Sequence, residues 1–265
     1  MASVDRDGVR ISYEERGDPD GEPVLLLEGL GYARWMWRWQ ADALDGYRLL
    51  LPDNRGTGGS DAPPGPYSID QLAADARAVV ADADAERPHV VGASMGGMIA
   101  LRYALDYEAR SLSLFCTSPG GPDAVPTPDE TLAVMFGVPD GADEREAIRY
   151  KMEPAIDALA DDEETLARIV DWRVASDAPP AAREAQGAAV EAFDVSDELD
   201  RIEVPTFVAH GTADRVLPVE NGHLLADRLG GESLFVEGGP HLFFVEAADR
   251  LNDRLTAFLA EASDE

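Results

Sequence analysis

Gly92-Ala93-Ser94-Met95-Gly96 is the stretch of this chain that decides its fold. The apolar run before it, residues 89–91, is typical of a buried strand, and residues 97–105 carry apolar side chains at helical spacing. A serine in a sharp turn between strand and helix is strained, and small residues on either side let the two elements approach closely. We therefore expect the Ser94 hydroxyl to project from the C-terminal edge of a sheet, beside helix N-terminal amides, as a nucleophile.

A nucleophilic serine needs a base, and the chain has four histidines. His241 lies in the loop after a predicted strand at 233–236, where functional side chains commonly stand. We expect His241 to be the base. His89 begins the strand that leads to the serine and so lies at the wrong end of the sheet. His210 is in an apolar run and is expected to be packed, and His223 is in a predicted helix.

A carboxylate should orient the base and stabilise its cationic form. Asp214 is the favoured candidate because it follows an apolar strand at 206–210 and precedes Pro218, which begins the next helix. Asp194 and Asp200 are weaker alternatives, since both come before that strand rather than after it.

Strand-like runs alternate with amphipathic helices along the chain, which predicts an α/β fold with a doubly wound, mostly parallel sheet. Between residues 118 and 202 the alternation stops and only helices are predicted. We therefore divide the chain into a core, 1–120 and 203–265, and a helical lid insertion, 121–202. The predicted strands are 9–14, 23–27, 47–51, 89–93, 111–117, 206–210 and 233–236. The predicted helices are 34–44, 69–85, 95–106, 219–229 and 247–262, with 130–136, 145–151, 163–176 and 181–193 in the insertion.

Three further segments, Leu27–Gly31, Trp37–Gln40 and Pro52–Asp61, complete a pattern that resembles the lid-bearing α/β-hydrolases over nearly the whole chain. Within that superfamily the chain is most similar to small esterases grouped with 3-oxoadipate enol-lactonases and aclacinomycin methylesterases. The resemblance implies the α/β-hydrolase fold and a serine hydrolase activity.

The chain order Ser94, Asp214, His241 is the order of the triad in this superfamily. The resemblance also implies an oxyanion hole made by two backbone N–H groups, those of Met95 and Leu30. Backbone donors suit this task because they are already oriented when the tetrahedral oxyanion forms.

Glu28 departs from the pattern, because many relatives carry histidine at this position. A carboxylate beside a developing oxyanion would oppose it, so Glu28 must point away or be paired, and Arg55 is one candidate partner.

The substrate pocket should be shaped by the lid and by the loop that contains Leu30. Its candidate lining residues are apolar and predict a mainly apolar acyl or alkyl group: Tyr32, Trp35, Met36, Met135, Phe136 and Trp172. A dianionic substrate would demand basic residues here, and Arg34, Arg38 and Arg173 are only weak candidates.

We therefore predict a serine hydrolase that cleaves a carboxylic ester of a small, mainly apolar molecule through an acyl-enzyme intermediate. The same triad would also serve a lactonase, a thioesterase or a cofactor-free perhydrolase. A non-catalytic ligand receptor on the same scaffold is the less favoured alternative.

Neither a cofactor nor a metal is expected. The glycines of residues 53–60 lack the Gly-Lys-Ser/Thr ending of a nucleotide-binding loop, and residues 29–31 lack a third glycine at dinucleotide spacing.

The net charge of the chain limits the kinds of molecule that it is expected to bind. With 22 basic and 52 acidic residues the formal charge is −30, which disfavours binding to nucleic acid or to anionic membranes.

No signal peptide is evident and no apolar run reaches the roughly 20 residues that span a bilayer, so we expect a cytoplasmic protein. The lone Cys116 lies in an apolar run and is expected to be a core residue. Whether the chain forms a homo-oligomer stays open.

An acidic surface with a single lysine, Lys151, resembles proteins from organisms that hold molar salt inside the cell. So much like charge strains the compact state at low ionic strength. At about 1 M salt the screening length falls to roughly 3 Å, and the repulsion largely vanishes.

We therefore predict that the melting temperature rises as KCl is increased from a dilute buffer to multimolar concentration. Circular dichroism melts with activity assays at each concentration check this. Full activity and an unchanged melting temperature without salt would instead indicate an ordinary acidic protein.

Overall fold

The computed structural model describes residues 1–263. Its centre is an eight-stranded sheet with the strand order β1-β2-β4-β3-β5-β6-β7-β8. β1, β2 and β4 pair antiparallel, and all pairs from β4 through β3 to β8 are parallel. The predicted doubly wound, mostly parallel sheet is confirmed. The strands are Ala2–Arg6 (β1), Val9–Gly17 (β2), Pro23–Leu27 (β3), Arg48–Pro52 (β4), His89–Ala93 (β5), Ser111–Phe115 (β6), Thr206–Gly211 (β7) and Glu232–Val236 (β8).

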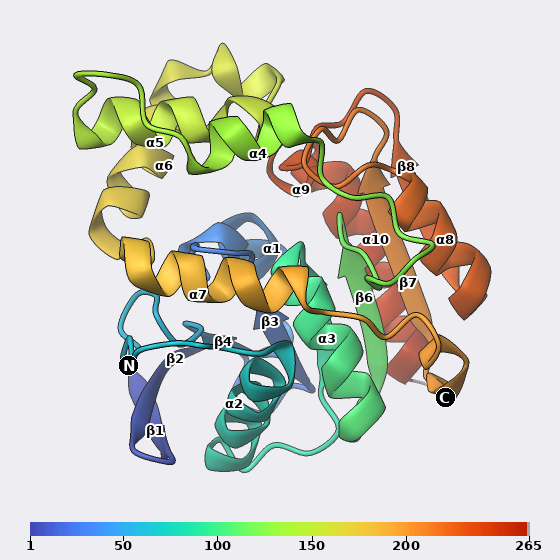
Figure 1. The fold of residues 1–265 in the computed structure, drawn as a ribbon. Coiled ribbons are helices and arrows are strands. Elements are labelled where there is room, and N and C mark those ends of the chain that lie inside the picture. Colours follow the sequence, from blue (N-terminus) through green and yellow to red (C-terminus); the bar gives the residue numbers. More distant parts are fainter. Residues whose placement is uncertain (264–265) are drawn as a thin grey trace.

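Helices cover both faces of this sheet (Figure 1). α2 packs against α3 beside β5, whereas α1 packs against α10, which contacts β6 and β7. The central strands β5, β6 and β7 are buried along their whole length, and their buried residues include polar ones such as Ser111 and Ser113. These helices are Arg38–Ala43 (α1), Ile69–Asp82 (α2), Met95–Asp106 (α3), Glu220–Leu229 (α8), Phe243–Glu246 (α9) and Ala248–Ser263 (α10), with a 3₁₀ turn at Arg34–Trp37.

Between β6 and β7 the chain forms a helical insertion, here defined as residues 121–202. Its helices lie over the C-terminal ends of the strands (Figure 1). They are Asp129–Phe136 (α4), Glu144–Met152 (α5), Glu163–Ser176 (α6) and Pro180–Glu191 (α7), with 3₁₀ turns at Glu153–Ala155, Ala158–Ala160 and Leu199–Arg201.

Polar contacts fasten this insertion to the core, among them those of two side chains, Gln186 and Glu246. Gln186 of α7, which is fully buried, accepts from the Gly31 N–H at 2.8 Å and donates to the Arg55 carbonyl at 3.0 Å. The carboxylate of Glu246 in α9 accepts three backbone N–H groups of residues 157–159 at 2.8–3.2 Å. The insertion is therefore tied to the loop after β3 and to the segment that follows His241.

Neither β1 nor α9 was predicted from the sequence, since the first predicted strand is 9–14 and the last predicted helix is 247–262. The turn at Asp7-Gly8, both at positive φ, reverses the chain between β1 and β2. Within residues 1–263, no helix is both long and apolar enough to cross a membrane.

Candidate active site

The turn between β5 and α3 holds Ser94 in a strained conformation, with φ 57° and ψ −123°. Its N–H donates to the Phe115 carbonyl at 2.9 Å, and the Thr117 hydroxyl donates to its carbonyl at 2.7 Å. A non-glycine residue keeps such a conformation only where its surroundings enforce it. The end of β6 therefore holds Ser94 at the C-terminal edge of the sheet, half-buried.

The glycines on both sides of this turn permit backbone contacts that no larger residue would allow. A Cβ on Gly92 would lie 2.1 Å from the Gly96 carbonyl oxygen, and a Cβ on Gly96 would lie 1.9 Å from the Leu27 carbonyl oxygen. The strand, the helix and the neighbouring β3 consequently approach each other backbone to backbone.

Asp214 and His241 come from the loops after β7 and β8 and form a buried pair. The His241 Nδ1 lies 2.7 Å from the Asp214 Oδ2. Backbone hydrogen bonds join the two loops: the Thr212 N–H donates to the Val236 carbonyl and the Ala213 N–H to the Gly239 carbonyl, each at 2.9 Å. The parallel pairing of β7 with β8 thus brings together two residues that are 27 positions apart.

The carboxylate of Asp214 is well supplied with donors. Its Oδ1 accepts the N–H groups of Val216 at 2.7 Å and Leu217 at 2.9 Å. The Nε2 of the fully buried His210 lies 3.2 Å from its Oδ2 and 2.9 Å from the Leu217 carbonyl oxygen. Burial would raise the pKa of Asp214, but the charge of His241 and hydrogen bonds from both histidines lower it well below its usual value. Asp214 is therefore a carboxylate throughout the physiological range.

The same pair determines the basicity of His241. Burial lowers the pKa of its imidazole, but the charge of Asp214 outweighs burial and raises that pKa well above its usual value. The carboxylate of Asp214 thus stabilises the imidazolium that forms when His241 takes up a proton.

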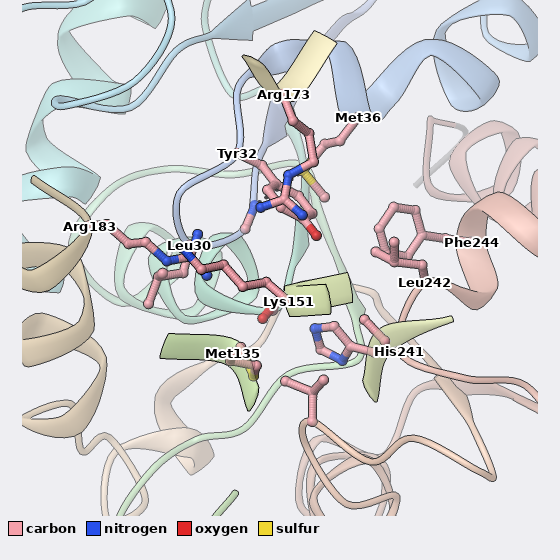
Figure 2. Close-up of a pocket in the computed structure, with 14 residues that line it drawn as sticks. Leu30, Tyr32, Met36, Met135, Lys151, Arg173, Arg183, His241, Leu242 and Phe244 are labelled. Atoms are coloured by element: carbon pink, nitrogen blue, oxygen red, sulfur yellow. Dashed lines mark hydrogen bonds between the residues drawn. The ribbon is translucent and has the colours of Figure 1, made fainter. Parts of the chain in front are cut away.

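Ser94 and His241 line one cavity, and Figure 2 labels His241 in its wall. Cys116, at the end of β6, stands behind the histidine, and ligand atoms of Cys116, Asp214 and His241 lie within 4.8 Å of one another. This is the one cluster of potential metal ligands within residues 1–263, and its Asp214 and His241 atoms already bond each other. Burial raises the pKa of the Cys116 thiol, which keeps it protonated.

The loop after β3 runs beside the serine, since a Cβ on Gly29 would lie 3.5 Å from the Ser94 Cβ. In this loop the N–H groups of Gly29 and Gly31 donate to side chains. The Leu30 N–H and the Met95 N–H at the start of α3 have no hydrogen-bond acceptor within the part of the chain that the structure describes. These are the two amides that the sequence analysis named for an oxyanion hole.

Glu28 points away from the cavity and is fully buried. The sequence analysis suggested Arg55 as its partner, but the two side chains do not pair. The Arg55 guanidinium instead binds Asp75 through two hydrogen bonds of 2.6 and 2.7 Å. The Oε1 of Glu28 accepts the Asn54 N–H, and its Oε2 has no partner among residues 1–263. Burial and then the nearby charge of Asp53 raise the pKa of Glu28 well above its usual value, so this carboxyl group is held as the neutral acid.

The six apolar side chains named for the pocket divide into two sets. Those that line the cavity are Tyr32, Met36 and Met135; those outside its lining are Trp35, Phe136 and Trp172. The rings of Trp35 and Trp172 pack on each other with centroids 5.7 Å apart, and Phe136 is 48% exposed. Aromatic packing at the base of the insertion accounts for the two tryptophans.

Of the three arginines considered for an anionic substrate, only Arg173 lines the cavity. Arg34 pairs with Asp53 at 3.1 Å, and the Arg38 guanidinium lies 4.5 Å from the Trp172 ring centroid. Sequence reasoning missed two further cations in the lining, Lys151 and Arg183. Their sequence context, helices rich in charge, is typical of a solvated face, although the uniqueness of the single lysine was a signal.

Comparison with known proteins shows the family of the chain. A sequence profile of the alpha/beta hydrolase fold matches residues 22–151. The chain is 34% identical to RutD of Variovorax paradoxus, a carbamate hydrolase by name, over 96% of this chain and 97% of that protein. It is 31% identical to the 2-hydroxy-6-oxo-6-phenylhexa-2,4-dienoate hydrolase of Comamonas testosteroni, over 95% and 91% of the two chains.

The structure is similar to that of the enol-lactonase from Burkholderia xenovorans, with a TM-score of 0.81 and 27% identity over 98% of this chain and 100% of that one. The chain belongs to the α/β-hydrolase family and is an enzyme of that family.

The close contacts of Gly96 give a test of the serine turn. Gly96→Ala should lower the free energy of unfolding by about 3 kcal/mol or more, because the added methyl group meets the Leu27 backbone. Urea unfolding measures this change. Gly46→Ala is the matched control, since a Cβ there meets nothing within 4 Å, and its effect should stay within about 1 kcal/mol. Equal effects would contradict this account of the turn.

The neutral form of Glu28 predicts a pH-dependent stability. The pKa of Glu28 is higher in the folded than in the unfolded chain. Its contribution to the free energy of unfolding is therefore fully present below the unfolded pKa and is lost as the pH rises through the folded pKa. Glu28→Gln keeps an acceptor for the Asn54 N–H and carries no charge. Its melting temperature relative to the unsubstituted chain should therefore increase from pH 4 to pH 7.

The control for this measurement is Glu237→Gln, which removes one charge from an exposed position. A difference in melting temperature that is the same at both pH values, or that matches the control, would show that Glu28 is ionised in the folded chain.

Proposed function

We propose that this enzyme is a serine hydrolase of carboxylic esters, with Ser94 as nucleophile, His241 as base and Asp214 as the residue that orients the base. The observation that carries the proposal is the buried Asp214–His241 hydrogen bond of 2.7 Å in a cavity that Ser94 also lines. With Nδ1 bound to a carboxylate, the Nε2 atom is left to accept a proton.

In the first half of the reaction the Ser94 Oγ attacks the ester carbonyl while His241 takes the hydroxyl proton. The tetrahedral intermediate then collapses, and His241 gives the proton to the leaving alcohol, which departs and leaves an acyl-serine. In the second half His241 takes a proton from water as the water oxygen attacks the acyl group. The tetrahedral intermediate then collapses, the bond to the Ser94 Oγ breaks, and His241 returns the proton to this oxygen as the acid is released.

The free N–H groups of Leu30 and Met95 are the proposed donors to the oxyanion. They belong to backbone segments fixed by close packing, so they need no reorganisation when charge develops. Removal of one such donor typically costs about 10²–10³ in rate. The neutral state of Glu28 explains how an acidic residue is tolerated next to this loop.

We propose that the helical insertion acts as a lid. It supplies Met135, Lys151, Ala155, Arg173 and Arg183 to the cavity wall. The cavity measures about 40 Å³, which is room for only a few water molecules, so a substrate requires the lid to move.

A lactonase is the second candidate, because the enol-lactonase of Burkholderia xenovorans shares the fold over the full length of both chains. A lactone is a cyclic ester and passes through the same steps, except that the leaving alcohol stays attached to the acyl group. A panel of p-nitrophenyl esters of increasing chain length, together with lactones and thioesters, in multimolar KCl separates these substrates.

Labelling with a fluorophosphonate tests the nucleophile. The unsubstituted chain should be labelled, and Ser94→Ala should not. Asp214→Asn should keep its fold, measured by circular dichroism, and lose about 10⁴ in turnover because His241 is no longer held in the right tautomer.

The matched control is Asp200→Asn, at an exposed carboxylate that pairs with Arg228 on the surface. Its turnover should be unchanged. Near-normal turnover of Asp214→Asn, or labelling that survives in Ser94→Ala, would overturn the proposed roles.

A further inference from the structure

We propose that the substrate carries a carboxylate group besides the bond that is cleaved, and that Lys151, Arg173 and Arg183 of the helical insertion bind it. This inference rests on the proposed hydrolase function and adds a substrate class to it. It differs from the mainly apolar substrate that the sequence analysis predicted.

The three cations surround one side of the cavity. Figure 2 shows Lys151, Arg173 and Arg183 on the side that Leu30 and Tyr32 line, across from His241. They come from three different helices, α5, α6 and α7. Convergence of three separate helices on one point is not what chance placement of surface charges produces.

Both guanidinium groups contact residues next to Leu30. A Cβ on Gly31 would lie 2.4 Å from the Arg183 Nη1, and the Arg173 Cζ lies 4.5 Å from the Tyr32 ring centroid. The cations thus lie beside the loop that carries one of the two free N–H groups, within reach of a substrate bound there.

Only one carboxylate balances these three charges. Asp177 binds Arg173 through the Nε at 2.8 Å and the Nη2 at 2.7 Å. Lys151 and Arg183 have no carboxylate within 4.0 Å among the residues that the structure describes. Arg173 is 2% exposed. Its Nη1 and the Nε of Arg183 are buried atoms that have no hydrogen-bond partner among residues 1–263.

An excess of positive charge here is costly. Burial lowers the pKa of Lys151, and so do the neighbouring charges of Arg183 and then Arg173. In a chain of net charge −30, acidic partners are abundant everywhere else, yet the cavity lacks them. Half-buried cations without a carboxylate partner, such as Lys151 and Arg183, and a buried guanidinium with a free N–H, such as that of Arg173, are stabilised when an anion binds them.

A carboxylate fits this set of donors. The guanidinium fork matches the planar shape of a carboxylate, and the Lys151 ammonium group adds hydrogen-bond donors from a third direction. The opposite wall is apolar, formed by Leu242 and Phe244 (Figure 2). The favoured substrate is therefore an ester or lactone with an anionic end toward the insertion and an apolar part against α9.

Paired substrates test the inference and locate the carboxylate. On the acyl side, p-nitrophenyl hemiglutarate is compared with neutral p-nitrophenyl valerate. On the alcohol side, 4-carboxyphenyl butyrate is compared with neutral 4-acetylphenyl butyrate. In one pair the anionic member should have the higher kcat/KM by about tenfold or more, mainly through KM, at constant ionic strength.

Lys151→Met and Arg183→Met remove the charge and keep an unbranched stem. Each should lower the ratio of anionic to neutral kcat/KM by about tenfold. The matched control is Arg145→Met, also in α5 but exposed and paired with Asp171, and its ratio should not change. Circular dichroism and fluorophosphonate labelling show that each variant is folded.

Three results would overturn the inference: no preference for either anionic ester, a preference that survives in both variants, or equal losses for both members of a pair. Equal losses would mean that the cations act on the oxyanion or on folding. Failure of labelling at Ser94 would instead reject the proposed function. In that case calorimetric titration with glutarate decides: binding lost in both variants supports the anion site, and absence of binding rejects it.

Discussion

The structure depends on the close approach of three backbone segments at Ser94. β5, α3 and the end of β3 meet at distances that exclude a side chain at Gly92 and Gly96. This packing forces Ser94 into a conformation that a serine does not otherwise favour, and it leaves the first amide of α3 without a partner. The strain is compensated by the sheet around it, in which β5, β6 and β7 are buried along their whole length.

The second constraint is the charge of Asp214, which is buried and yet ionised. Two backbone N–H groups and two histidines supply its donors, and this solvation within the protein replaces water. His210 is thereby part of the site although it faces no substrate. The contrast with Glu28 is instructive, since that carboxyl group receives fewer donors, lies near a second acid and is kept neutral. Two buried acids thus have pKa values shifted in opposite directions for identifiable reasons.

The sequence was most informative where the fold itself requires particular residues. The glycines at the serine turn, the strand before Asp214 and the loop of His241 are local patterns, so the core elements and the candidate triad could be proposed without coordinates. The cations of the cavity could not, because Lys151 and Arg183 lie on helices whose charge pattern looks solvent-facing, and only the tertiary fold turns them inward. Trp35 and Trp172 were expected to line the pocket for a similar reason. In the structure their rings pack on each other instead.

The helices of the insertion are not held to the core equally firmly, and this difference bears on how a substrate reaches Ser94. α7 is held by Gln186, whose two hydrogen bonds to the core backbone lie in the interior and would be lost together if that helix swung outward. α4 buries only Thr131 and presents Leu132 and Phe136 to solvent. The Thr131 hydroxyl donates to the Arg215 carbonyl, but α4 has no buried side chain besides Thr131. If the insertion moves as proposed, we therefore expect α4 to move more easily than α7 and substrate to enter beside α4.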